Sequence, residues 1–187
     1  MTMALFPNKI KSKTLIPSKS ASFINKKLKQ LLGLFLFSTG ISLVIILFSY
    51  DPTDPSFRSA TSLQAKNMLG SFGSYVADPL HLAIGPSAYG IPLVCFVWSW
   101  RFIFKKPTQS FINRIIFFPV TIAVLSMFFA AHPAPDNWYF SYGLGGVFGD
   151  NALSLLLESN IMEINVLLKI TTVGLAISTI FLLSHSL

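Results

Sequence analysis

The 187 residues are 52% hydrophobic and only 11% charged, far from the roughly 25% charged residues of an average soluble domain. Because the apolar residues fall in long blocks, this composition excludes an ordinary water-soluble domain and favours an integral membrane protein. The single cysteine, Cys95, excludes an intramolecular disulfide and a cysteine-based zinc cluster.

Residues 1–30 form a basic tail that holds seven lysines, and no acidic residue precedes Asp51. A segment rich in Lys, Ser and Asn with few large apolar residues is typical of disorder. We therefore expect a disordered cytoplasmic tail that orients the chain in the membrane. The same lysines could also contact anionic lipid or DNA, and the sequence leaves these alternatives open.

Four apolar blocks follow the tail, and each is long enough to cross a bilayer. They predict an all-α integral membrane domain over 31–187, with spans at about 31–48, 80–104, 115–131 and 164–187. Lys and Arg concentrate before the first block and between the second and third, where Arg101, Lys105, Lys106 and Arg114 lie. The positive-inside rule then places both termini in the cytoplasm. Lys169 is expected to reach the outer headgroups or to pair with Glu158 or Asp150.

The two outer loops, at about 49–79 and 132–163, each contain a short helical pattern. Small and apolar residues share one face over 65–76, which predicts an amphipathic helix that ends at Asp78 and Pro79. Residues 151–160 predict a second one. These helices could lie in the membrane interface or pack on the ends of the spans.

The two halves of the chain resemble each other. Each has a span, a turn with Pro and Asp, a Gly-x-Phe-Gly step and an outer helix, the steps being Gly70 to Gly73 and Gly146 to Gly149. A repeated helical hairpin and a chance likeness both remain possible interpretations of so short a match.

Two groups of loop residues are candidates for structure or interaction. Asp51, Pro52, Asp54 and Pro55 predict a rigid turn after the first span, because proline fixes backbone angles and Asp accepts bonds from nearby amides. The second group joins aromatic residues to glycines that permit close packing, either of the chain itself or of a partner: Trp138, Tyr139, Phe140, Gly145, Gly146 and Gly149. The alternative for the aromatic residues is an ordinary interfacial belt.

Nothing in the sequence predicts catalysis, a cofactor site or a metal site. The glycines of 143–149 lack the Gly-x-Gly-x-x-Gly spacing, and His81, His132 and His185 lie in three separate regions. An enzyme acting in the outer loops would need a nucleophile with a neighbouring base, and none is found.

Several motifs appear in one order along the chain: Ser-Tyr-Asp-Pro-Thr-Asp-Pro-Ser-Phe at 49–57, residues 67–78, Ala-Tyr-Gly-Ile-Pro at 88–92, and Trp-Tyr-Phe at 138–140 followed by 145–149. Together they closely resemble the N-terminal four-helix membrane domain of the FtsK-type (FtsK/SpoIIIE family) bacterial DNA translocases. The resemblance covers about residues 31–187. It implies an inner-membrane anchor at the division septum that contacts lipid and other division proteins, forms homo-oligomers and tethers a cytoplasmic DNA motor.

One departure limits what the resemblance carries over. The family continues past the fourth span into a linker and motor, whereas this sequence stops at Leu187 and has no Gly-x-x-x-x-Gly-Lys-Ser/Thr loop. An excised domain and a naturally short homologue are the two alternatives, and we expect the former. The chain is then without enzyme activity, and ATP, Mg²⁺ and DNA are bound only by the missing motor.

A small transporter or channel subunit is the alternative function. It would need polar groups at mid-membrane, where the first and third blocks offer only Ser38, Thr39, Ser42, Thr121 and Ser126.

Overall fold

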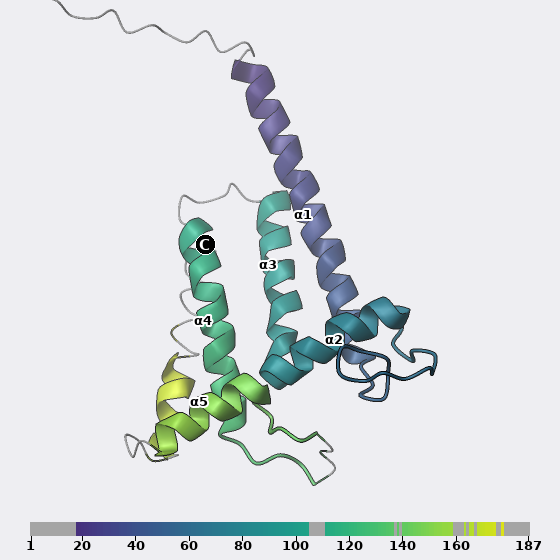
Figure 1. Ribbon diagram of the computed structural model, residues 1–187. Coiled ribbons are helices and arrows are strands. Elements are labelled where there is room, and N and C mark those ends of the chain that lie inside the picture. Colours follow the sequence, from purple (N-terminus) through teal and green to yellow (C-terminus); the bar gives the residue numbers. More distant parts are fainter. Residues whose placement is uncertain are drawn as a thin grey trace, which may run out of the picture.

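The computed structural model describes residues 18–104, 111–136, 138, 140–158, 163, 165–166, 168–174 and 177. In this part of the chain every regular element is helical: α1 (Ser18–Phe48), α2 (Gly70–Ile84), the 3₁₀-helix η1 (Gly85–Tyr89), α3 (Gly90–Phe104), α4 (Phe111–Ala130) and α5 (Gly146–Glu158). Figure 1 shows that α1, α3 and α4 share one general direction, whereas α2 and α5 run crosswise at one end. We call this end, with its two loops, the loop end.

Helices α1 and α3 pack closely because small residues line their contact. A Cβ atom at Gly33 would lie 2.7 Å from Cγ1 of Ile103, and one at Gly40 would lie 2.9 Å from the Phe96 ring. Ser99 of α3 is buried in the same contact. Small residues let two helix backbones approach within a membrane, where packing and not water exclusion holds helices together.

The described residues contain two apolar helical stretches long enough to span a bilayer, 23–48 and 70–104, and a shorter one at 117–130. The second stretch is not straight, because α2 turns into η1 at Gly85, which has a positive φ of 55°. Through Gly90, with helical angles, η1 continues into α3. Together η1 and α3 measure about 32 Å, enough for a hydrocarbon core of about 30 Å. The predicted span of 80–104 lies within the apolar stretch 70–104.

The prediction of a disordered tail is wrong for residues 18–30, which form the first turns of α1. This segment contains Lys, Leu and Gln, which are good helix formers, and no proline interrupts it before Phe48. The apolar run that follows therefore extends backwards as helix. Residues 1–17 lie outside the described residues.

The prediction that the first loop helix ends at Asp78 and Pro79 is also wrong, because α2 includes Pro79 and runs to Ile84. A proline inside a helix removes one hydrogen bond and crowds the preceding turn. Tertiary contacts of the two residues before the proline offset that cost. Ala77 is fully buried, and Asp78 binds the side chains of Tyr50 and Arg58.

Helix α5 begins at Gly146, five residues before the predicted start at 151. The starts of α2 and α5 have the same backbone geometry. Gly70 and Gly146 have φ values of 63° and 64°, and each donates its amide to the carbonyl three residues earlier. Gly73 and Gly149 each donate to the carbonyl four residues earlier. This agreement favours the interpretation that the chain repeats a helical hairpin.

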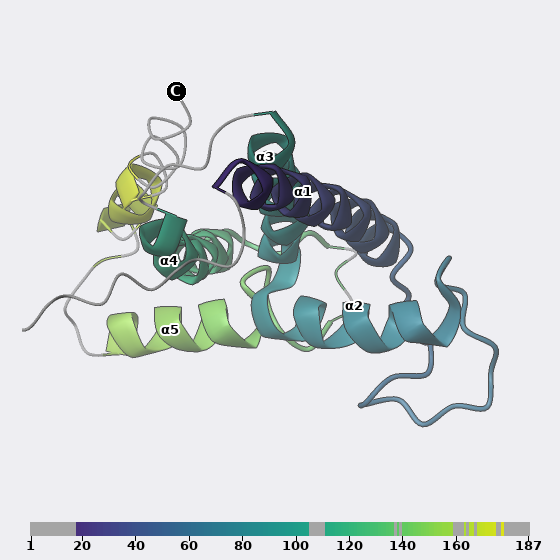
Figure 2. The same ribbon diagram turned by 90° about the horizontal axis from the view of Figure 1, so that it is seen from above.

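Helices α2 and α5 meet end to end and form one line beside the spans (Figure 2). The junction is tight, because a Cβ atom at Gly146 would lie 2.6 Å from the backbone nitrogen of Gly85. Of the predicted fourth span, 165–166, 168–174 and 177 are described and helical. The rest of that prediction lies outside the described residues.

Candidate functional site

The turn after α1 is held by the side chain of Asp51. The backbone amide and hydroxyl of Thr53 both donate to Oδ1 of Asp51, at 2.8 and 2.6 Å, and Nζ of Lys66 lies 2.8 Å from Oδ2. The bond from Lys66, followed by those from Thr53, lowers the pKa of Asp51 to about 2. The turn therefore keeps its charge and its shape at neutral pH.

Asp54 fixes the first loop to the beginning of α2. Its side chain is 3% exposed, and its two carboxylate oxygens accept the backbone amides of Lys66 and Asn67 at 2.8 and 2.9 Å. Nδ2 of Asn67 in turn donates to the carbonyl of Ile46 at 2.8 Å. One carboxylate thus connects the loop, the end of α1 and the residues that lead into α2.

A half-buried ion pair, in which Asp78 is buried and the Arg58 side chain is 39% exposed, joins the first loop to the middle of α2. Nε and one terminal nitrogen of Arg58 donate to the two oxygens of Asp78, at 3.0 and 2.5 Å, and the hydroxyl of Tyr50 donates to Asp78 at 2.8 Å. This two-point geometry is the strong form of an Arg–carboxylate contact. Asp78 raises the pKa of Arg58, while burial and then the bond to Asp78 raise the pKa of Tyr50. All three side chains therefore keep their protonation states, and with them their hydrogen bonds, around neutral pH.

Aromatic rings connect this network to the second loop. The Tyr50 ring stacks on His81 of α2 with centroids 4.4 Å apart, and on Phe140 of the second loop at 6.0 Å. Trp138 meets the edge of Phe140 at 4.8 Å and donates its indole N–H to the carbonyl of Tyr142 at 2.6 Å. Tyr50 is therefore the point where both loops and α2 meet.

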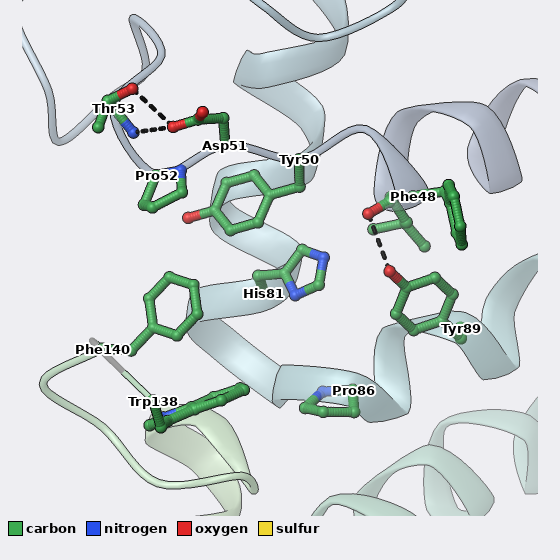
Figure 3. A pocket seen from close by; sticks show the side chains of 11 residues that line it. Phe48, Tyr50, Asp51, Pro52, Thr53, His81, Pro86, Tyr89, Trp138 and Phe140 are labelled. Carbon is green, nitrogen blue, oxygen red and sulfur yellow. Dashed lines mark hydrogen bonds between the residues drawn. The ribbon is translucent and has the colours of Figure 1, made fainter. Parts of the chain in front are cut away.

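Beside these rings lies a pocket of about 710 Å³ between the two loops and the end of α1. Figure 3 shows Tyr50, His81 and Phe140 along its middle, with Asp51 and Thr53 on one side and Tyr89 on the other. Among the described residues, its lining is Leu47, Phe48, Tyr50, Asp51, Pro52, Thr53, His81, Pro86, Tyr89, Trp138 and Phe140. Its volume lies in the range of small-molecule pockets, and its aromatic lining suits an apolar or ring-bearing group.

The glycines of the second loop serve contacts within the chain. Gly145 and Gly149 face α4, where Cβ atoms would lie 2.7 and 2.5 Å from the carbonyl oxygen of Ser126. The hydroxyl of Ser126 donates to the carbonyl of Gly145 at 2.5 Å. Of the two interpretations of these glycines, internal packing therefore describes the structure, and their backbones are not open to a partner.

The site residues predicted from the sequence have different places in the structure. Asp51, Pro52, Trp138 and Phe140 meet at the pocket. Asp54, Pro55, Gly73, Gly145, Gly146 and Gly149 hold the loop end together. Gly70 starts α2 in open space, and Tyr139 lies outside the described residues.

The sequence analysis missed Tyr50, Arg58, Asn67 and Asp78 as functional residues, and it set His81 aside. One signal was available. Asp78 and Arg58 are opposite charges within the first loop, and Asp78 is the only acidic residue of α2, where a buried charge needs a partner.

No group of three or more potential metal ligands occurs among the residues that the structure describes. The pocket, the stacked rings and the loop clamps of the site suit a binding surface on a membrane domain.

Comparison with known families agrees with this architecture. A family model described as the 4TM region of DNA translocase FtsK/SpoIIIE matches residues 25–187. The chain belongs to this family. The match is to the membrane region of that family and not to its motor, so the chain is a membrane domain.

Similar curated proteins are named DNA translocase FtsK. The chain is 38% identical to that of Rickettsia typhi over 106 residues, or 56% of this chain and 14% of the relative. It is 35% identical to that of Rickettsia bellii over 111 residues (58% and 14%), and 29% identical to that of Azospirillum brasilense over 130 residues (68% and 21%). The matches thus cover about a fifth or less of these relatives' lengths. No solved structure matches the chain.

Proposed function

We propose that the chain anchors a cell-division DNA translocase in the bacterial inner membrane and brings it to the division septum. Membership of the FtsK/SpoIIIE membrane-region family carries this proposal. The tethered cytoplasmic motor, which would bind ATP, Mg²⁺ and DNA, belongs to the longer proteins that the relatives represent. The function of the domain is then to position that motor where chromosomes cross the division plane.

In this proposal the chain crosses the membrane four times, with both termini in the cytoplasm. Seven lysines precede the apolar part of α1, Arg101 lies in the last turn of α3, and Lys105 directly follows that helix. Such clusters favour the cytoplasmic side. The loop end, with its pocket, then faces the periplasm, where it can meet the outer parts of other division proteins.

We assign the pocket between the loops as the docking site for an apolar or aromatic segment of such a protein. Both loops and α2 contribute to it, so it is complete only when the loop end is folded. The domain is also expected to self-associate, because a DNA motor of this kind works as an assembly of identical subunits. Native mass spectrometry of the domain extracted with its lipid would report that assembly.

Localisation in dividing cells tests the proposal. A fluorescent fusion of the full-length parent protein should gather at the septum, and Trp138→Ala with Phe140→Ala should weaken that gathering while the protein still accumulates in the membrane. Trp100→Ala is the matched control, because Trp100 is an exposed aromatic residue on α3 and outside the pocket.

A photoreactive residue at Phe48, which is exposed and lines the pocket, identifies what occupies the site. Capture of a division protein, lost in the Trp138 and Phe140 variant, supports docking there. Capture of lipid alone, with septal gathering unchanged in that variant, refutes the assignment of the pocket.

A further inference from the structure

Helix α2 has its polar and apolar faces reversed relative to a helix in water. Its inward face carries the helix's only acidic group and its only histidine, the buried residues being Gly73, Ser74, Ala77, Asp78 and His81. The exposed residues of α2 are Ser71, Phe72, Tyr75, Pro79 and Ala83. The last four recur every three or four positions and therefore share one face, and Ser71 lies at its edge. A helix facing water shows the opposite pattern, with its polar face outward.

Helix α5 continues this exposed apolar face. Phe148 has the same place in its Gly-x-Phe-Gly step as Phe72, and both rings are exposed, by 46% and 68%. Leu155 is also exposed and lies on the Phe148 side of α5, with Ala152 between them. Ala83 of α2 lines a shallow hollow of about 410 Å³ together with five residues of α5: Val147, Phe148, Asn151, Ala152 and Leu155. Since the two helices lie end to end (Figure 2), their faces join.

We define the apolar strip as Phe72, Tyr75, Pro79, Ala83, Phe148, Ala152 and Leu155, and we propose that it lies in the bilayer interface and contacts the acyl chains of the leaflet at the loop end. Exposed apolar surface of this kind marks a membrane or a protein contact. A protein contact normally supplies hydrogen bonds across its area, yet the hydroxyl of Tyr75 is the one polar side-chain group within the strip, and the exposed polar residues that border it beside Phe72 and Phe148 are Ser71 and Asn151. Lipid needs no such groups, and the strip lies where the spans reach the end of the hydrocarbon core.

In this arrangement α2 and α5 lie along the membrane interface and fix how deeply the domain is inserted in the bilayer. Their polar contacts, such as the bond of Asp78 to Tyr50, face the loops and hold the two helices to the bundle. Because the strip lies at the ends of the spans in either orientation, the proposal stands or falls independently of membrane orientation and of septal targeting.

Site-directed spin labelling tests the strip directly. In a Cys95→Ser background, which removes the only native thiol, a nitroxide is placed at Phe72→Cys, Ala83→Cys or Phe148→Cys. The chain is reconstituted in phosphatidylethanolamine and phosphatidylglycerol vesicles, and accessibility is measured to oxygen, which enters lipid, and to a nickel chelate, which stays in water. Ser154→Cys is the control, because Ser154 is exposed on α5 and lies about 120° around the helix from Phe148.

The proposal expects greater access to oxygen than to nickel at all three strip positions, and the reverse at Ser154. Ala83→Cys is a small change at an exposed site, so it reports on the strip even if replacement of a phenylalanine disturbs folding. Nickel access at the strip equal to that at Ser154 would place it in water and overturn the proposal. Low access to both reagents, with dipolar broadening that disappears on dilution with unlabelled chain, would show that a second copy of the chain, and not lipid, covers the strip.

Discussion

Asp54 should account for much of the order of the first loop. In Asp54→Asn the side chain keeps one acceptor oxygen and presents an NH₂ group to the second backbone amide, so one of the bonds to Lys66 and Asn67 is lost. Hydrogen bonds to a charged group contribute about 1.5–3 kcal/mol, and an unpaired buried donor costs a similar amount. We therefore expect the loop to be destabilised by about 2 kcal/mol, which raises its open fraction about 30-fold.

Hydrogen–deuterium exchange of the reconstituted domain measures this effect, since the amides of Lys66 and Asn67 report on loop opening. Their protection should fall in Asp54→Asn and fall further in Asp54→Ala, where both bonds are lost. Asp51→Asn is the control, because the pair between Asp51 and Lys66 lies at the surface, where such pairs contribute little. Unchanged protection in Asp54→Asn, or equal loss in Asp51→Asn, would refute the assignment of Asp54 as the clamp.

Three further predictions concern the packing and orientation of the loop end. Gly146→Ala should lower the thermal unfolding temperature more than Gly70→Ala, because both glycines have positive φ but only Gly146 abuts another backbone; equal shifts would contradict this. A double-mutant cycle of Arg58→Met and Asp78→Asn should give a coupling free energy of about 1 kcal/mol. This is less than a fully buried pair would give, because the Arg58 side chain is 39% exposed. Additive effects of the two substitutions would show that the pair contributes nothing. A reporter enzyme fused after Arg58 should be active outside the cytoplasm and one fused within 105–110 should be cytoplasmic, whereas the reverse pattern would invert the proposed topology.

Four residues of the pocket could be found from the sequence because they are unusual for their surroundings. Asp51 and Pro52 follow a long apolar run, and Trp138 and Phe140 interrupt a polar loop, so each marks a change of environment. The sequence could not reveal that these residues line one pocket. The two pairs lie more than 80 positions apart in the chain, and only the way in which the hairpins pack decides that distance.

The course of α2 shows how tertiary contacts override a local signal. Proline after Asp78 predicts a helix end on local sterics alone. The bonds of Asp78 to Arg58 and Tyr50 involve residues 20 and more positions away, so no local pattern contains them. The helix therefore continues, and its continuation moves the turn into the span to Gly85.

The sequence by itself determined the class of the protein, a helical membrane domain, because blocks of apolar residues dictate helices wherever backbone groups lack water to bind. It also located the repeated Gly-x-Phe-Gly steps, because only glycine takes positive φ without strain. The tertiary structure alone decided that Gly146 packs against Gly85 and that Tyr50 joins two loops. These contacts arise when separate hairpins close on one another, and their free energy depends on that closure and not on the neighbours of each residue in the chain.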